Sequence, residues 1–286
     1  MKKIIYFIEF LLVEFLFIIC KVIGYKSASN LGFFIGKNFG NFFRKKKSII
    51  ENLHKSKIVI NTSDNQFVNN VLGNYGRILA EYPFLKDFRK NKLEQFIRID
   101  GIENLDKIKI NKKPVVFISG HFNNFELMAM QIEKHGINLA AIYRPLNNIF
   151  LNKTMERIRT KYICRNQIRK GRSGTRQILE NLKKGNSIAL MIDQRVTEGI
   201  KIDFFGNLAS TTTIPAQIIK KYECDLVPIY IERLEKYNFK MYVSQPIAIN
   251  SEKSQEEISE HLNTILEKMI LKNPDQWIWT HNRWKK

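Results

Sequence analysis

The chain has 286 residues, 44% of them hydrophobic and 26% charged, which argues against a disordered protein and is enough for one large domain with a full core. Its formal net charge of +20 predicts a negatively charged partner: nucleic acid, an anionic membrane surface, a phosphorylated lipid or an acidic protein. The three cysteines lie far apart and show no CxxC or Cys/His spacing, so the sequence favours neither a disulfide framework nor a zinc site, and a reducing compartment fits.

The first predicted element is an apolar helix over residues 4–23, interrupted by Glu9, Glu14 and Lys21. Such a stretch matches the about 20 residues that cross a bilayer. A carboxylate at the bilayer centre, however, costs on the order of 3 kcal/mol. A membrane span, an interfacial helix and a helix packed on protein therefore all stay open, whereas the two glutamates argue against the hydrophobic region of a signal peptide.

A second helix is predicted from the glycines at 32, 36 and 40, whose four-residue period leaves a narrow face with aromatic residues between them. It packs closely on another helix or lies on the membrane. The basic cluster that follows, residues 44–47, suits anionic headgroups but is also typical of a solvated turn. We interpret residues 1–45 as a hydrophobic membrane-anchoring helical segment and residues 46–286 as the catalytic domain.

Beyond residue 60 the pattern becomes that of a globular domain, beginning with a helix over residues 64–88. Apolar strand candidates follow at 96–99, 115–118, 139–143, 187–192, 226–231 and 239–243. Helical patterns alternate with them near 125–135, 148–162, 174–184, 213–222 and 255–271. This alternation predicts a single α/β domain with a largely parallel central sheet and helices on both faces.

The segment "SGHFNNFE", residues 119–126, follows the strand candidate at 115–118 and places a histidine five positions before a glutamate. Ligands bind at the carboxyl ends of strands in such sheets, so His121 is a candidate general base, with Glu126 one helical turn on as its carboxylate partner. Alternatively, Asn123 caps a helix and Glu126 completes a capping box. No GxSxG motif is present, so the implied chemistry is direct activation of a hydroxyl or water.

Several blocks resemble one known family in the same order along the chain. They are "GHFNNFE", "AIYRPLNN", "GRSGTRQILENLKKGNSIALMIDQR", "KIDFFGNLASTTTIPAQI", "DLVPIYIER" and "DQWIWTHNRW". The first looks like the HxxxxD/E block of the lysophospholipid acyltransferase superfamily, and the set is similar to its branch that adds secondary acyl chains to lipid A. The resemblance covers almost the whole chain.

The resemblance implies that His121 removes the proton from an acceptor hydroxyl, that Glu126 is its partner, and that the hydroxyl then attacks the thioester of an acyl carrier. It also makes Arg144 a substrate-binding residue, and an arginine there suits a phosphate or an oxyanion. A surface ion pair is the alternative for Arg144. Neither a metal nor another cofactor is needed for this chemistry.

The other substrate-binding candidates come from the same blocks. Arg169 and Arg172, with Ser173 as a helix N-cap, form a basic helix start suited to phosphate, or else a solvated loop. Asp193 and Gln194 end a strand on the same sheet edge, where they would orient the glycan acceptor or cap the strand.

We therefore expect an O-acyltransferase that moves a fatty acyl chain from an acyl carrier protein thioester, or from acyl-coenzyme A, to an anionic lipid A precursor. The expected location is the cell inner membrane, with the catalytic domain on the cytoplasmic side. Open alternatives are a lysophospholipid or phosphoinositide glycolipid acceptor, a lipid or thioester hydrolase, and a non-catalytic membrane-binding protein. Nucleic acid is not an expected partner, because the basic residues are spread and no recognition motif is found.

Overall fold

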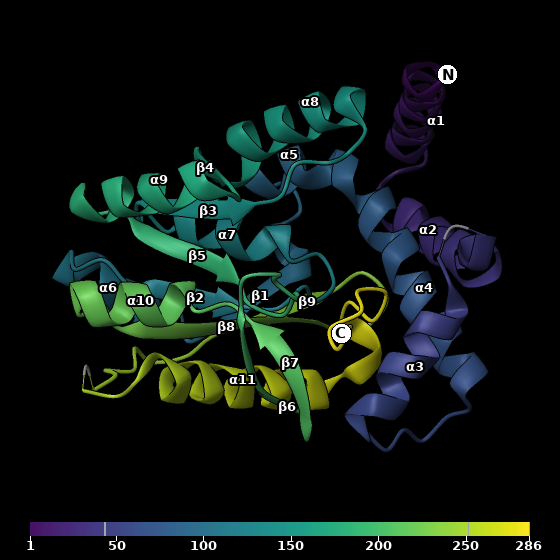
Figure 1. Ribbon diagram of the computed structural model, residues 1–286. Helices are drawn as coiled ribbons and strands as arrows, with labels where there is room; N and C mark the ends of the chain where they lie inside the picture. Colours follow the sequence, from purple (N-terminus) through teal and green to yellow (C-terminus); the bar gives the residue numbers. More distant parts are fainter. Residues whose placement is uncertain (43, 251, 286) are drawn as a thin grey trace.

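A mixed sheet in the strand order β1-β9-β8-β2-β5-β3-β4 forms the centre of the computed structural model (Figure 1). The structure describes residues 1–42, 44–250 and 252–285, except for the side chain of Arg172. The strands are β1 (Ile97–Asp100), β2 (Val116–Ser119), β3 (Leu139–Tyr143), β4 (Asn166–Arg169), β5 (Ser187–Met191), β8 (Leu226–Arg233) and β9 (Phe239–Val243). A separate antiparallel pair consists of β6 (Ile200–Phe204) and β7 (Asn207–Thr211).

The neighbouring strands β8, β2, β5, β3 and β4 all run parallel to one another. At one edge, β9 pairs antiparallel with β8, and β1 pairs parallel with β9, so these two strands run in the opposite direction. Every residue of the central strand β2 is buried, as expected for a parallel strand covered on both faces. The predicted α/β fold with a largely parallel sheet is therefore confirmed.

The helices that connect the parallel strands lie on both faces of the sheet (Figure 1). They are α7 (Glu126–Lys134), α8 (Ile149–Ile158), α9 (Arg172–Lys183) and α10 (Ile214–Tyr222). The chain moves one way across the sheet from β2 through β3 to β4, then back through β5 to β8. Because such crossovers are right-handed, α7 and α8 cover one face, and α9 and α10 the other. The carboxyl ends of β2 and β5 lie where this direction changes, which is the usual ligand site of such folds.

The remaining helices frame the sheet (Figure 1). They are α1 (Lys2–Ile23), α2 (Tyr25–Phe39), α3 (Lys46–Ser56), α4 (Asp64–Glu81), α5 (Leu85–Arg89), α6 (Ile102–Asn111) and α11 (Gln255–Lys272). None of the helices in the described part of the chain is long and apolar enough to span a membrane.

The four-residue glycine period of α2 forms a close crossing with α4. A methyl group on Gly32 would overlap the carbonyl oxygen of Gly76, and one on Gly36 would overlap that of Leu72. The backbones therefore touch, because these glycines have no side chains. The crossing attaches the N-terminal helices to the rest of the domain.

The sequence patterns did not predict helices α3 and α6, strand β4 or the β6–β7 hairpin. The edge strand β4 shows why. Its sequence is Asn-Gln-Ile-Arg, and Ile168 is its one buried residue, so it lacks the apolar run that marks the inner strands.

Replacing Gly32 by Ala tests the crossing. An exposed helical Gly→Ala change stabilises a protein by about 1 kcal/mol, but here we expect a loss of about 1–3 kcal/mol from overpacking. Urea unfolding of the two proteins gives the difference directly. Ser27→Ala, at an exposed position of the same helix, is the control and should change stability little. A stabilised Gly32→Ala variant would contradict the crossing.

Candidate active site

His121 lies in the loop between β2 and α7, at the carboxyl end of the central strand. This loop is held from two sides. Phe122 forms a β-bridge with Trp277, and the backbone amide of Asn123 donates to the carbonyl oxygen of Gln276 at 3.1 Å. The side-chain amide of Asn124 donates to Glu81, at the end of α4. The imidazole position is therefore set by tertiary contacts rather than by the loop alone.

The carboxylate that pairs with His121 is Asp193, from the loop after β5. Its Oδ1 lies 2.8 Å from His121 Nδ1, and its Oδ2 accepts the backbone amide of His121 at 2.7 Å and the indole N–H of Trp277 at 2.9 Å. The side chain of Asp193 is fully buried. Burial acts to raise its pKa, but His121 and these hydrogen bonds outweigh it and hold the pKa below the ordinary value. Asp193 is therefore ionised and accepts Nδ1–H, which leaves Nε2 as the basic nitrogen.

Glu126 has different partners in the described residues. Its Oε1 accepts the Tyr82 hydroxyl at 2.9 Å and the Arg159 guanidinium from Nε at 2.8 Å and from Nη2 at 2.6 Å. Burial acts to lower the pKa of Arg159, but Glu126 and Tyr82 raise it above the ordinary value. The structure therefore brings His121 together with Asp193, and Glu126 together with Arg159.

The capping-box interpretation of Asn123 and Glu126 is wrong. Helix α7 begins at Glu126 itself, and no side chain caps it. Asn123 has a φ of 42°, outside the right-handed helical region, so the chain turns before the helix starts. For the same reason, Glu126 is not one regular helical turn beyond His121.

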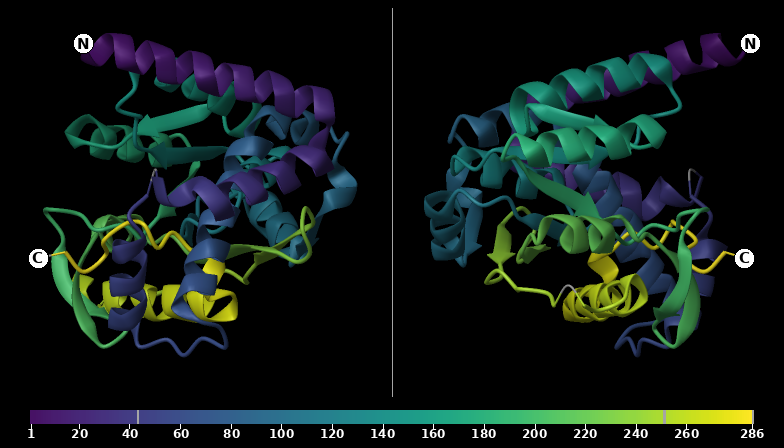
Figure 2. Two further views of the ribbon diagram at one scale, coloured as in Figure 1. Left: turned by 90° about the vertical axis from the view of Figure 1, so that its right-hand side faces the viewer. Right: turned by 60° about the vertical axis from the view of Figure 1, so that its left-hand side comes forward.

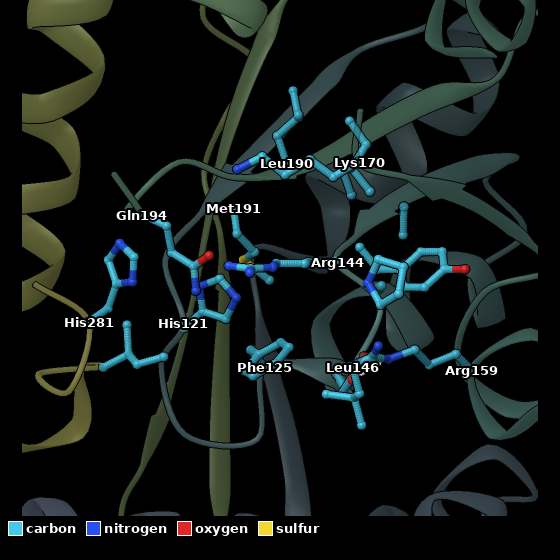
Figure 3. A pocket seen from close by; sticks show the side chains of 18 of the residues that line it. His121, Phe125, Arg144, Leu146, Arg159, Lys170, Leu190, Met191, Gln194 and His281 are labelled. Carbon is cyan, nitrogen blue, oxygen red and sulfur yellow. Dashed lines mark hydrogen bonds and ion pairs between the residues drawn. The ribbon is translucent and has the colours of Figure 1, made fainter. Parts of the chain in front are cut away.

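A cavity of about 480 Å³ opens beside His121 (Figure 3). Its polar lining includes His121, Glu126, Arg159, Gln194 and His281, and three further cations line it: Arg44, Arg144 and Lys170. In the view of Figure 3, the rings of His121 and His281 lie at one end of the cavity and Arg159 lies toward the other. The volume suits a sizeable organic ligand, and the cations suit an anionic one.

The apolar part of the cavity is built on small side chains of the sheet. Ala141 of β3 pairs in register with Ala189 of β5 on one side and with Gln167 of β4 on the other. All three line the cavity, together with Ala129 of α7. Alanines on adjacent strands leave room above the sheet that larger residues would fill.

The other predicted site residues have three different outcomes. Arg144 and Gln194 line the cavity. Asp193 hydrogen-bonds to His121 and Trp277, and its side chain is fully buried, so it does not face an acceptor in the cavity. Arg169 ends β4, and neither it nor Ser173 is among the cavity-lining residues of the described chain.

The predicted helix N-cap at Ser173 is also wrong. Helix α9 begins at Arg172 with Gly171 at the N-cap position, and none of the described side chains caps it. Ser173 is an exposed residue of the first turn. The side chain of Arg172 lies outside the described part of the structure.

Sequence reasoning missed several residues of the site. Arg159 begins a π-helical turn, Arg159–Ile163, directly after α8, and such turns occur often at functional sites. The "DQWIWTHNRW" segment contains His281, whose Nε2 accepts the backbone amide of Arg195 at 2.9 Å. Burial lowers the pKa of His281, so its imidazole is neutral and carries its proton on Nδ1. Motif spacing gave no signal for Tyr82 or Lys170.

A histidine paired with a buried aspartate lies beside a basic and apolar cavity. Comparisons with known proteins identify the family. Residues 1–286 match the family model of the bacterial lipid A biosynthesis acyltransferases. The chain belongs to this family. As a family member, it is an acyltransferase that transfers acyl chains to a lipid A precursor, and the resemblance drawn from the sequence is confirmed.

Individual relatives within this lipid A acyltransferase family are distant. The lipid A biosynthesis palmitoleoyltransferase of Escherichia coli (strain K12) is 24% identical over 217 residues, which cover 73% of this chain and 68% of the relative. The lipid A biosynthesis lauroyltransferase of the same organism is 23% identical over 202 residues, 68% of this chain and 63% of the relative. A lipid A biosynthesis acyltransferase of Haemophilus influenzae is 19% identical over 197 residues, 66% of this chain and 59% of the relative.

Asp193→Asn tests the role of the buried carboxylate. An amide keeps the shape but no longer fixes the Nδ1–H tautomer, so we expect the transfer rate to fall by roughly 10³- to 10⁴-fold, as in comparable carboxylate–histidine sites. The acyl transfer rate and the circular dichroism spectrum are compared with the wild type. A folded variant with a normal rate would contradict the pairing.

The Glu126–Arg159 pair gives a second test. Glu126→Ala leaves a buried guanidinium without its counter-charge, so we expect a loss of about 3–5 kcal/mol in unfolding free energy. The double variant Glu126→Ala with Arg159→Met removes both charges and should recover most of that stability, as measured by urea unfolding. Additive losses in the double variant would show that the two charges are not coupled.

Proposed function

We propose that the enzyme transfers a fatty acyl chain from a carrier thioester to a hydroxyl of an anionic lipid A precursor, with His121 as the general base. The observation that carries this proposal is the pairing of His121 Nδ1 with the buried Asp193, at the edge of a cavity that is basic and apolar. A histidine that acts as a base needs a fixed tautomer. An acylated anionic lipid needs cations for its phosphates and apolar side chains for its acyl chains.

The proposed reaction runs through a tetrahedral intermediate. Nε2 of His121 takes the proton of the acceptor hydroxyl as that oxygen attacks the carbonyl carbon of the thioester. The C–S bond then breaks, and the departing thiolate takes the proton back from the imidazolium. Asp193 stabilises the imidazolium between these two steps, because its pKa is held low and it stays ionised.

We assign Glu126 the role of positioning residue. It joins α7 to Tyr82, which directly follows α4, and to Arg159, at the start of the π-helical turn. These contacts fix one wall of the cavity and place the Arg159 guanidinium within it. This role replaces the direct pairing with His121 that the five-residue spacing suggested.

The cations at the cavity have a binding role in this proposal. Arg144, Lys170 and Arg44 provide positive charge for the phosphates of the acceptor, and Gln194 orients its sugar hydroxyls. Burial and the positive charge of Arg144 lower the pKa of Lys170. Two cations that line the same cavity favour an anion between them. Arg169, next to Lys170 in the chain, extends the positive surface.

The acyl chain occupies the apolar part of the cavity in this proposal. Ala129, Ala141 and Ala189 provide a smooth surface of small side chains there. The thiol carrier is an acyl carrier protein or coenzyme A. Both are anionic, and both suit a protein of net charge +20.

We further propose that residues 1–45 bind the cytoplasmic face of the inner membrane. Helix α1 exposes many large apolar side chains to solvent: Ile4, Ile5, Phe7, Ile8, Leu11, Leu12, Phe15, Ile18 and Val22. On α2, Phe34, Ile35 and Phe39 are exposed as well. Exposed apolar residues in such number mark an interaction surface. The basic cluster at 44–47 adds attraction to anionic headgroups.

His121→Ala tests the proposed reaction, because without its base the acceptor hydroxyl is a poor nucleophile. Mass spectrometry follows a tetra-acyl lipid A precursor incubated with acyl carrier thioester, or with acyl-coenzyme A in a parallel reaction. We expect the wild type to add one acyl group and the variant to add none. His54→Ala is the matched control, since His54 also pairs with an aspartate, Asp64, but on the exposed surface.

Transfer at the wild-type rate by the His121 variant would refute the mechanism. Acylation of a lysophospholipid or a phosphoinositide glycolipid, but not of the lipid A precursor, would place the acceptor outside this proposal. Release of free fatty acid alone would favour a hydrolase, in which His121 activates water.

A further inference from the structure

Both glutamates of α1 face the neighbouring helix α8. Glu9 Oε2 accepts the side-chain amide of Asn148 at 2.9 Å. Glu14 lines an open surface hollow that is also lined by Lys153 and Arg157 of α8. Figure 2 shows α1 running along the outside of the molecule beside α8. The carboxylates that would be costly inside a bilayer therefore lie on the protein side of α1, where Glu9 is hydrogen-bonded and Glu14 shares a hollow with two cations.

Asn148 makes four hydrogen bonds from one nearly buried side chain. Its Nδ2 donates to the Tyr6 carbonyl oxygen at 2.8 Å and to Glu9, while its Oδ1 accepts the backbone amides of Phe150 at 3.1 Å and Leu151 at 3.2 Å. The carbonyl half thus caps α8, and the amide half binds α1. The two functions reside on different atoms and are separable by mutation.

Asn148 directly follows the wall segment, residues 144–147, all of which line the active-site cavity. The backbone amide of Leu146 is held by Asn152 of α8 at 2.9 Å. The wall segment is therefore tied to the start of α8 at both its middle and its end. Asn148 is thus hydrogen-bonded to α1 and continuous in sequence with the wall segment that contains Arg144.

We propose that Asn148 is a positioning residue that couples the binding of α1 to a lipid surface with the geometry of the wall segment. The lipid surface holds the apolar face of α1, and the two hydrogen bonds from Asn148 to α1 transmit this restraint to Arg144 and Leu146. Acyl transfer is consequently faster when the enzyme is bound to a bilayer. This inference rests on the acyl transfer proposed above.

The test uses Asn148→Asp, which separates capping from coupling. A carboxylate caps α8 as well as an amide does, but it cannot donate to Tyr6 or Glu9, and it repels Glu9. Adding Glu9→Gln supplies a donor on α1 and reverses the polarity of the contact, so the double variant should recover the coupling. Asn61→Asp, an exposed change of the same charge in the loop before α4 and outside the membrane-binding segment, is the matched control.

Each full-length protein is assayed for kcat and KM with the acceptor in anionic phospholipid vesicles and in neutral detergent micelles. We expect the wild type and the control to have a higher kcat in vesicles than in micelles. Loss of two hydrogen bonds should lower the vesicle kcat of Asn148→Asp by about tenfold, with little change in micelles. Flotation should show equal vesicle binding for all four proteins, and the double variant should regain most of its vesicle rate.

Hydrogen exchange of residues 143–147, with and without vesicles, tests the coupling independently of catalysis. We expect vesicles to slow exchange in the wild type and in the double variant, but not in Asn148→Asp. The coupling would be overturned if Asn148→Asp lost the same fraction of its rate in vesicles and in micelles. It would also be overturned if vesicles slowed exchange equally in all four proteins. If no protein transfers an acyl chain while the exchange pattern holds, the proposed reaction fails and the coupling stands.

Discussion

The buried carboxylate of Asp193 is the constraint on which the site depends. An ionised group without exposure to water needs donors from the protein. Here they come from the backbone and ring of His121 and from the indole of Trp277. These donors belong to the loop after β2 and to the C-terminal segment. Asp193 therefore contacts two chain regions that are far apart in sequence. The pairing that satisfies the carboxylate also gives His121 the tautomer of a base.

A second buried carboxylate, Glu81, holds the other side of the His121 loop. It forms a two-pronged ion pair with Arg233 of β8, at 2.7 and 3.0 Å, and also accepts hydrogen bonds from Ser29 and Asn124. The N-terminal helices, the sheet and the His121 loop therefore meet at this group. Together with the glycine crossing of α2 and α4, this packs the N-terminal helices against the rest of the fold, while α1 leaves an apolar face exposed.

Much of the fold and part of the site were predictable from the sequence. Alternating apolar strands and helices predicted the sheet, and the position of His121 after a buried strand indicated the candidate base. The carboxylate partner of His121 was not predictable from spacing, because the expected helical turn would have placed Glu126 beside it. The backbone of Asn123 instead enters the left-handed region and delays the helix. Asp193 was predicted to orient the acceptor or to cap its strand. Its pairing with His121 could not be predicted, because the two residues come together only when β2 pairs with β5. Arg159 lies in an irregular turn that no periodic pattern marks.

The central claim is that Asp193 holds His121 with its proton on Nδ1 and with Nε2 free to accept one from the substrate. Nitrogen-15 NMR of the histidine ring, in the wild type and in Asp193→Asn, tests this most directly, because the two nitrogens report separately whether they are protonated. The account predicts a protonated Nδ1 and an unprotonated Nε2 in the neutral wild-type ring, and loss of that preference in the variant. A wild-type ring protonated on Nε2 would contradict it.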